Sequence, residues 1–481
     1  MRHTIAALIA LSLTAPAIAQ TPPKAKPPAS AAAPANLWHV KGRGLFSDII
    51  AIPSVTDRTD EVKKLTTYLK AQFVAGGITD VVVKDHDGTQ SMIVRWPAEV
   101  KAKGKKAAKA TLKPILLLGH MDVVEALPAD WSRDPFKLIE EDGYLYGRGT
   151  VDMKNGIAAI TNALLWLKAE GFKPKRDIIV FFSGDEETGG NGAMRAATEW
   201  RALVDAEYAL NADAGGGAFL KNGMLLGFGM QTSEKMYQDF TFSVRNPGGH
   251  SSRPRPDNAI YELSSALKKL EAHRFSPAFT ETTRAYLQFR QRQEQGALGD
   301  AMRRWLANKD DAAAADLIEA DQSEIGTTRT RCVATRLDGG HANNALPQLA
   351  RATVNCRILP GVTAEAVQAE LQTVVGEGVK IEPIQLAKPS PPSPLRVDVT
   401  KAYTDAVRKR HPGAEIVPQM SQGATDGLFF RSEGLPVYGV NGTWIVIPDD
   451  ERAHGRDERI PVKSFYETLD HWHDMVKALA G

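Results

Sequence analysis

The chain has 481 residues, more than a single hydrophobic core usually supports, so two domains are expected. Its 59 basic and 57 acidic side chains give a formal net charge of +2, and this near balance offers no electrostatic argument for nucleic-acid binding. A local run of lysines at residues 101–109 contains no aromatic residue, and we expect an exposed loop there rather than a nucleic-acid or membrane site.

The N-terminal residues have the pattern of a secretory signal peptide. A short basic start precedes an apolar stretch at residues 5–13, and Ala17-Ile18-Ala19 matches a small-x-small cleavage site. We therefore expect residues 1–19 to be a signal peptide and residues 20–36, rich in Pro and Ala, to be a flexible tether. The apolar stretch is too short to span a bilayer, and no later segment reaches about 18 consecutive apolar residues. The mature protein is expected to be exported, most simply to a bacterial periplasm, without a membrane anchor.

An apolar run at residues 114–119 leads directly into His120-Met121-Asp122. The run predicts a buried strand, which delivers its last side chains to the sheet edge where open α/β folds place their ligands. There His120 could bind a metal ion and Asp122 could orient its ring. Taken alone, a histidine at a strand end is more often structural than a ligand.

Four further segments bring metal-binding side chains in comparable contexts. They are Asp152 before an Ala/Leu-rich helix expected over residues 155–170, Glu186 and Glu187 after an apolar run at 177–184, Asp213 after another at 208–212, and His454 in a polar loop near the C-terminus. Each segment singly is typical of a solvated turn or a helix cap. Their succession favours a metal site, because zinc prefers imidazole nitrogen and carboxylate oxygen ligands.

Seven motifs between about residues 115 and 461 together resemble one enzyme family. They are G-H-M-D-V-V, Y-G-R-G-T-V-D-M-K, S-G-D-E-E-T-G-G, N-A-D-A-G-G, P-G-G-H-S-S-R-P, N-A-L-P and A-H-G-R-D-E-R-I-P. The family is the zinc-dependent peptidase and deacylase family of carboxypeptidase G, carnosinase-type dipeptidases, aminoacylase, acetylornithine deacetylase and succinyl-diaminopimelate desuccinylase.

The resemblance implies two Zn²⁺ ions per subunit, for which Co²⁺ or Mn²⁺ could substitute. His120 and Asp213 would hold one ion, Glu187 and His454 the other, and Asp152 would bridge both. This arrangement leaves room for a bridging hydroxide as the nucleophile.

The resemblance also implies roles for two carboxylates that bind no metal. Glu186 would be the general base and then the general acid, a role that requires hydrogen-bond reach of the attacking water. Asp122 would orient His120.

The interval between Asp213 and His454 contains a second pattern of elements. A strand at residues 239–244, a helix at 258–270, strands at 328–337 and 350–359, a helix at 363–375 and a strand at 379–386 give the order βαββαβ. This order suggests a four-stranded ferredoxin-like layer, and the family has such a lid, commonly used for dimerisation.

The predicted fold is therefore α/β. It combines a mixed-sheet, dizinc aminopeptidase-like catalytic domain with an inserted α+β ferredoxin-like lid. We assign the catalytic domain to residues 37–235 and 389–481 and the lid to residues 236–388. A mostly helical insertion over about residues 276–322 has no readable purpose.

Four residues outside the ligand set match substrate-handling positions of the family. His250, in a glycine turn of the lid, would stabilise the tetrahedral oxyanion, often in the active site of the partner subunit. Asn344 and Arg357 would hold the substrate backbone or carboxylate, although a loop brace or a surface charge is an equal alternative for each. Thr425, in Gly-Ala-Thr-Asp, resembles a loop near the substrate with the same alternative.

The two cysteines, Cys332 and Cys356, fall in strand-like segments and are expected in an oxidising compartment. A cross-strand disulfide and two separate buried thiols are both compatible with the sequence.

The leading functional hypothesis is an exported dizinc hydrolase that cleaves amide bonds of small peptides by metal-hydroxide attack, and that forms a homodimer through the lid. The nearest alternative takes N-acyl amino acids, because the Asp-x-Gly-Gly context of Asp213 also resembles the carboxypeptidase S and N-acyl amino acid amidase branch. An alternative of another class is a metal-binding protein that has lost catalysis and binds partners.

Overall fold

The computed structural model describes residues 37–99 and 112–481. The expected signal peptide, the tether and the lysine run at 101–109 lie outside the described residues. Within the described residues, no helix combines the length and apolar character needed to cross a membrane.

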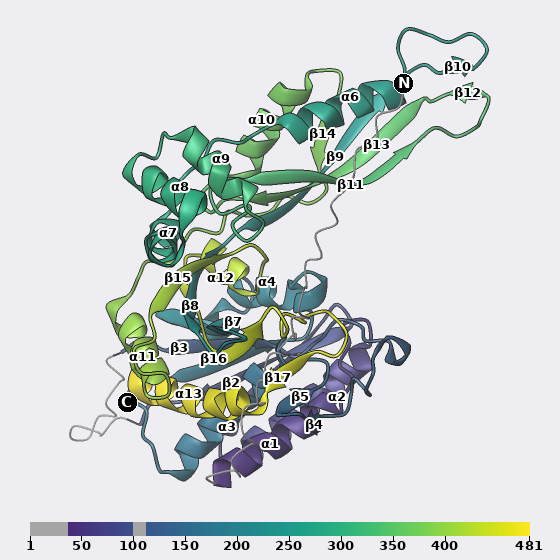
Figure 1. Ribbon diagram of the computed structural model, residues 1–481. Coiled ribbons are helices and arrows are strands. Elements are labelled where there is room, and N and C mark those ends of the chain that lie inside the picture. The colour runs from purple at the N-terminus through teal and green to yellow at the C-terminus, as the bar shows by residue number, and fades with distance from the viewer. Residues whose placement is uncertain (1–36, 100–111) are drawn as a thin grey trace, which may run out of the picture.

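The larger part of the molecule is built on an eight-stranded mixed sheet (Figure 1). In the order of the sheet, its strands are β1 (Asp80–His86), β2 (Thr89–Trp96), β6 (Ile178–Ser183), β3 (Ile115–His120), β7 (Tyr208–Leu220), β16 (Val437–Ile447), β8 (Leu225–Glu234) and β15 (Ile416–Ser421). The central strands β6, β3, β7 and β16 are parallel to one another, so their C-terminal ends lie at one edge.

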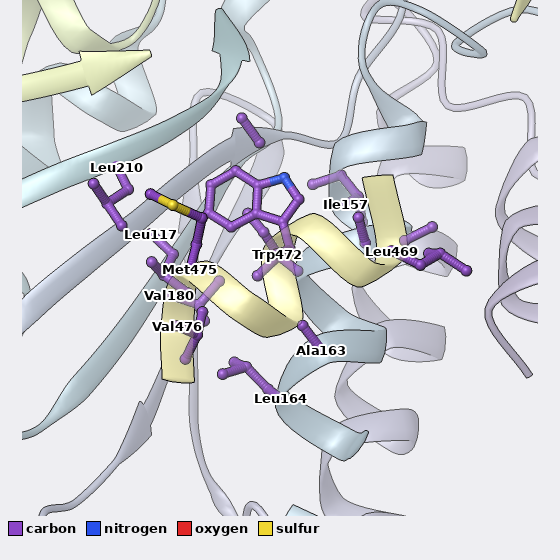
Figure 2. Close-up of a cluster of buried hydrophobic side chains, with 14 of the residues drawn as sticks. Leu117, Ile157, Ala163, Leu164, Val180, Leu210, Leu469, Trp472, Met475 and Val476 are labelled. Carbon is purple, nitrogen blue, oxygen red and sulfur yellow. The ribbon is translucent and has the colours of Figure 1, made fainter. Parts of the chain in front are cut away.

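Helices cover both faces of this sheet, which explains why its central strands are continuous apolar runs. One face carries α1 (Leu37–Ile50), α2 (Thr59–Ala75), α3 (Lys154–Ala169), α11 (Val397–Arg408) and α13 (Val462–Ala480). The other carries α4 (Asn191–Ala197), α5 (Arg201–Val204) and α12 (Gly427–Ser432). In β3, Leu117 faces the first set of helices and Leu116 the second. Figure 2 shows the first core, where Trp472 of α13 lies among side chains of the sheet and of α3.

Strand β7 is longer than the apolar run at 208–212 that predicts it. It continues to Leu220 through Gly215 and Gly216, which have φ values of +90° and +100°. A Cβ at Gly215 would lie 2.6 Å from the carbonyl oxygen of Gly439 in β16, so only glycine permits this close approach. The glycines therefore bend a continuous strand instead of ending it.

A second, four-stranded antiparallel sheet lies apart from the first (Figure 1). Its strands, in sheet order, are β11 (Arg331–Gly339), β13 (Leu349–Ile358), β9 (Met236–Arg245) and β14 (Lys380–Pro383), and it packs against α6 (Ala259–Ala272) and α10 (Ala364–Val375). Helix α10 begins with a side-chain cap, since the Thr363 hydroxyl accepts a hydrogen bond from the Ala366 N–H at 3.2 Å. Cys332 and Cys356 face each other across β11 and β13 and form a disulfide, which resolves the alternative left by the sequence.

Three helices follow α6 and form a small core of their own. They are α7 (Glu281–Gln293), α8 (Gly296–Ala307) and α9 (Ala312–Ala320), packed around Trp305. Helix α7 contacts β15, the edge strand of the large sheet, so the insertion covers an otherwise open edge.

The remaining elements are short. They are β4 (Ile139–Glu141), β5 (Tyr144–Tyr146) and β17 (Arg459–Pro461) in a three-stranded sheet, the pair β10 (Gly249–His250) and β12 (Ala345–Leu346), and the 3-10 turns η1 (Pro128–Asp130) and η2 (Glu186–Thr188).

Candidate metal centre

The large sheet brings the five predicted ligands to one place. His120 is the last residue of β3, Asp213 lies within β7, and Glu187 follows β6 in η2. Asp152 precedes α3, and His454 lies in the loop before β17. Because β3, β6 and β7 are parallel, the residues at their C-terminal ends meet at one edge, as expected for a ligand site on such a sheet.

The five side chains form two groups that share Asp152. The Nε2 atom of His120 lies 3.1 Å from Oδ1 of Asp152 and 3.4 Å from Oδ1 of Asp213. The Nε2 atom of His454 lies 3.1 Å from Oδ2 of Asp152 and 3.1 Å from Oε2 of Glu187. Each oxygen of the Asp152 carboxylate therefore faces a different histidine, as a bridging ligand requires.

The donor set fits metal ions. In each of the two groups, the potential ligand atoms all lie within 4.8 Å of one another. The Oε1 atom of Glu187 is buried and has no hydrogen-bond partner among the described residues, and a bound cation would compensate it. Three carboxylates beside two imidazoles also carry excess negative charge, which favours cations.

Asp122 makes contacts with both sides of this centre. The Nδ1–H of His120 donates to the Asp122 carbonyl oxygen at 3.0 Å, which leaves Nε2 free for a metal. The Asp122 carboxylate lies 3.5 Å from the same Nδ1 and accepts a hydrogen bond from the Thr56 hydroxyl at 2.5 Å. It also accepts hydrogen bonds from the backbone N–H groups of Glu186, at 3.2 Å, and Glu187, at 3.0 Å.

Glu186 lies at the same centre in a buried setting. Its carboxylate is grouped with His120 and Glu187 within 4.8 Å. Burial raises the pKa of Glu186 to about 10, and the negative charges of Asp213 and Asp426 add to the increase. A cation held by the neighbouring ligands would oppose this increase and favour the charged form.

Arg148 and Glu458 form a buried ion pair beside the ligands that the sequence did not single out. Their side chains are 2.7 Å apart and almost fully buried. The pairing of β5 with β17 brings their two loops together. Both residues lie inside motifs quoted above, Y-G-R-G-T-V-D and H-G-R-D-E, so motif membership and opposite charge were the available signal.

His250 and Asn344 lie together but far from the ligands. His250 is the last residue of β10 and Asn344 directly precedes β12, and this short pair lies at the end of the second sheet that points away from the large sheet (Figure 1). The Asn344 carbonyl accepts a hydrogen bond from the Ser251 N–H at 3.0 Å, and the exposed His250 ring bonds the Ser252 hydroxyl through Nδ1 at 2.8 Å. Among the described residues, no hydrogen bond or ion pair joins the His250 side chain to any of the five ligands.

Arg357 and Thr425 are placed differently. Arg357 lies on β13, and its guanidinium stacks over the ring of Tyr237 at 4.6 Å. Thr425 is buried, and its hydroxyl donates to Glu234 at 3.0 Å while accepting from Asn211 at 3.2 Å. These contacts brace the loop from within, and the substrate contacts expected for both residues stay predictions.

Comparison with known proteins gives a consistent family match. The model of peptidase family M20/M25/M40 matches residues 116–478. The chain is 29% identical over 425 residues to the probable carboxypeptidase S-like 2 of Dictyostelium discoideum, covering 86% of this chain and 76% of that protein. It is 30% identical over 373 residues to the human N-fatty-acyl-amino acid synthase/hydrolase PM20D1, covering 74% of this chain and 72% of that protein.

Among solved structures, the chain is similar to the M20 family metallo-carboxypeptidase Sso-CP2 from Sulfolobus solfataricus. The TM-score is 0.65 with 16% sequence identity, and the match covers 91% of this chain and 98% of that one. At this identity the likeness concerns the fold.

Proposed function

Because the chain belongs to peptidase family M20/M25/M40 and is a hydrolase acting on amide bonds, we propose that it cleaves small peptides with two zinc ions. The observation that carries the proposal is the shared Asp152, whose two oxygens face His120 and His454 separately. One carboxylate between two groups of ligands is the arrangement that two neighbouring ions need.

In this proposal His120 and Asp213 would hold one ion, Glu187 and His454 would hold the other, and Asp152 would be shared by both. The ions, when bound, would polarise the amide carbonyl and make a water molecule easier to deprotonate. Glu186 takes the proton of the attacking water and returns it to the leaving amine. Its position beside the ligands, without a ligand role in either of the two groups that share Asp152, supports this assignment.

N-acyl amino acids are the second candidate substrates. The relatives of 29% and 30% identity are named for carboxypeptidase-like and N-fatty-acyl-amino acid activities, and both substrate classes are amides with an amino acid as the leaving group. Arg357 is the candidate for binding the free carboxylate of that amino acid.

The substrate class is tested by assaying the zinc-loaded protein on dipeptides, on C-terminally extended peptides and on N-acyl amino acids. Hydrolysis of the peptides is expected. Hydrolysis of N-acyl amino acids alone would select the second candidate. Hydrolysis of no substrate would favour a metal-binding protein that has lost catalysis and acts through partners.

We further propose that the second sheet is a ferredoxin-like lid through which two chains form a homodimer. Its strand order, with the first and third strands in the centre, supports the ferredoxin-like assignment. Edge strand β11 and the start of α6 expose apolar side chains, with Val333 60%, Leu337 66% and Tyr261 72% exposed. An unpaired strand edge next to apolar side chains is suited to pairing with a second copy.

A dimer would also give His250 a role. Its distance from the ligands of its own chain supports the proposal that it stabilises the oxyanion in the partner's active site.

We also propose that the protein is exported to the periplasm, as the N-terminal sequence pattern predicts. N-terminal sequencing of the secreted protein would test cleavage after Ala19.

A further inference from the structure

The buried Arg148 and Glu458 side chains form an ion pair and, in addition, several hydrogen bonds to the surrounding backbone. Glu458 is 0% exposed, and its carboxylate accepts hydrogen bonds from the Arg148 guanidinium at 2.7 Å and from three backbone N–H groups. These are the N–H groups of Gly149 at 3.1 Å, Val151 at 2.6 Å and Asp152 at 3.0 Å. The carboxylate therefore fixes the backbone immediately before the bridging ligand Asp152.

Arg148 holds the opposite loop. Its Nη2 atom donates to the backbone carbonyl oxygens of His454 at 3.3 Å and Gly455 at 3.1 Å. It also reaches the Glu125 carbonyl at 3.4 Å. One ion pair thus connects the loop that carries Asp152 with the loop that carries His454.

The ligands differ in how firmly the fold holds them. His120 and Asp213 are part of buried strands of the large sheet. His454 lies on a loop, its side chain is 54% exposed, and its backbone has a φ of +61°. A positive φ is unfavourable for a histidine, so surrounding contacts must maintain it.

We propose that Arg148 and Glu458 are positioning residues that hold His454 and Asp152 at the spacing that the ion between His454 and Glu187 requires. The inference rests on the proposed dinuclear centre and deepens it, because it makes the two ions unequal. Both ions share Asp152, but the ion at His120 and Asp213 has its other two ligands on the sheet, whereas the ion at His454 relies more on the Arg148–Glu458 pair.

Two substitutions separate this role from a general loss of stability. Glu458→Gln keeps the shape of the side chain but replaces one acceptor oxygen by an NH₂ group that faces backbone donors. Arg148→Lys keeps the charge opposite Glu458 but loses the planar fork that reaches the His454 and Gly455 carbonyls. If Glu458→Gln fails to fold, Arg148→Lys still tests the proposal.

The matched control is Glu324→Gln, just after the helical insertion. Glu324 is a buried carboxylate that accepts hydrogen bonds from Arg290 at 2.9 Å and Tyr286 at 3.1 Å, away from all ligands. A purely structural effect of removing a buried carboxylate would be the same in Glu324→Gln and Glu458→Gln.

The experiment is a titration of the metal-free full-length protein with Co²⁺ and Zn²⁺, followed by calorimetry and by the visible spectrum of bound Co²⁺. The unchanged protein is expected to bind two ions. Glu458→Gln and Arg148→Lys are expected to bind the ion at His454 about 10- to 100-fold more weakly, the usual effect of losing a group that orients ligands. The ion at His120, which shares only Asp152 with the disturbed loops, is expected to be weakened less. Glu324→Gln is expected to bind both ions normally.

If the folded Arg148→Lys variant binds both ions with the affinities of the unchanged protein, the positioning role is overturned and the dinuclear centre stays in place. Equal weakening of both ions would also overturn it, because the inference requires unequal sites. If the unchanged protein binds fewer than two ions, the dinuclear proposal fails and this inference fails with it.

Discussion

Asp122 holds Glu187 through the backbone, because its carboxylate accepts the Glu187 N–H at 3.0 Å. The same carboxylate accepts the N–H of Glu186 at 3.2 Å and lies 3.5 Å from the ring of His120. The sequence predicted contact with the histidine alone. The structure adds that Asp122 connects the end of β3 with the turn that carries the proposed base.

Replacing Asp122 by Asn is therefore expected to disturb two groups together. The amide would present an NH₂ group to backbone N–H donors that now have a carboxylate acceptor. We expect kcat to fall about 10- to 100-fold with a smaller change in KM, measured by steady-state kinetics on the best substrate. Asp130→Asn, in the exposed turn η1, is the control and should retain normal kinetics. An unchanged kcat in Asp122→Asn would remove Asp122 from the positioning of the site.

Glu186→Gln tests the proposed base. The amide cannot accept the proton of water, so kcat should fall by at least about 10²-fold, the lower end for general acid–base groups. The metal content should stay at the wild-type value because Glu186 lies outside the two groups that share Asp152. The measurements are kcat and metal analysis of the same preparation, with the exposed Glu199→Gln as control. Undiminished turnover would exclude the base role, and lost metal would make Glu186 a ligand.

His250 provides a test of assembly. His250→Ala and Glu186→Gln should each be nearly inactive, with the loss for His250→Ala about 10²- to 10³-fold in kcat. In co-expressed mixtures, half of the dimers are mixed and each has one complete site, so activity should return to about a quarter of wild type. The control pairs Glu186→Gln with His273→Ala, a lid histidine that contacts Glu370 of the same chain at 2.8 Å. No recovery in the His250 mixture, with tagged mixed dimers isolated, would contradict a role in trans.

The sequence was sufficient for features that depend on local pattern. The apolar run before His120 became the central strand β3, and the helix behind Asp152 and the helix expected at 363–375 lie within a residue of their predicted places. It was insufficient where two distant segments meet. The Arg148–Glu458 contact joins residues 310 positions apart, and neither loop alone indicates a buried partner.

A leucine-to-alanine change is expected to act differently in the core and on the exposed edge strand β11. Leu117 is fully buried between the sheet and α13 (Figure 2), so Leu117→Ala should reduce the free energy of unfolding by about 2–5 kcal/mol. Leu337 is 66% exposed on edge strand β11, so Leu337→Ala should change the stability of a single chain by less than about 0.5 kcal/mol. Its expected effect is weaker dimerisation, measured by sedimentation at decreasing concentration. Full dimer strength in Leu337→Ala would argue against this edge as the interface.

His471 predicts how stability depends on pH. The side chain is buried in α13, with its Nε2–H donating to the Val440 carbonyl at 2.9 Å. Burial, with the positive charge of Arg410, lowers the pKa of His471 to about 3. In the unfolded chain the same ring titrates near its ordinary pKa of about 6.5.

Between these two pKa values the unfolded chain binds one proton more than the folded chain. The free energy of unfolding therefore falls as the pH is lowered from 6.5, by about 1.4 kcal/mol per pH unit, and this loss is absent above pH 6.5. From pH 6.5 to pH 5 the wild-type protein should lose about 2 kcal/mol that His471→Gln does not lose. Urea unfolding of both proteins at each pH isolates this difference, because all other titrating groups are shared. Parallel pH profiles would mean that His471 titrates alike in the folded and unfolded chains.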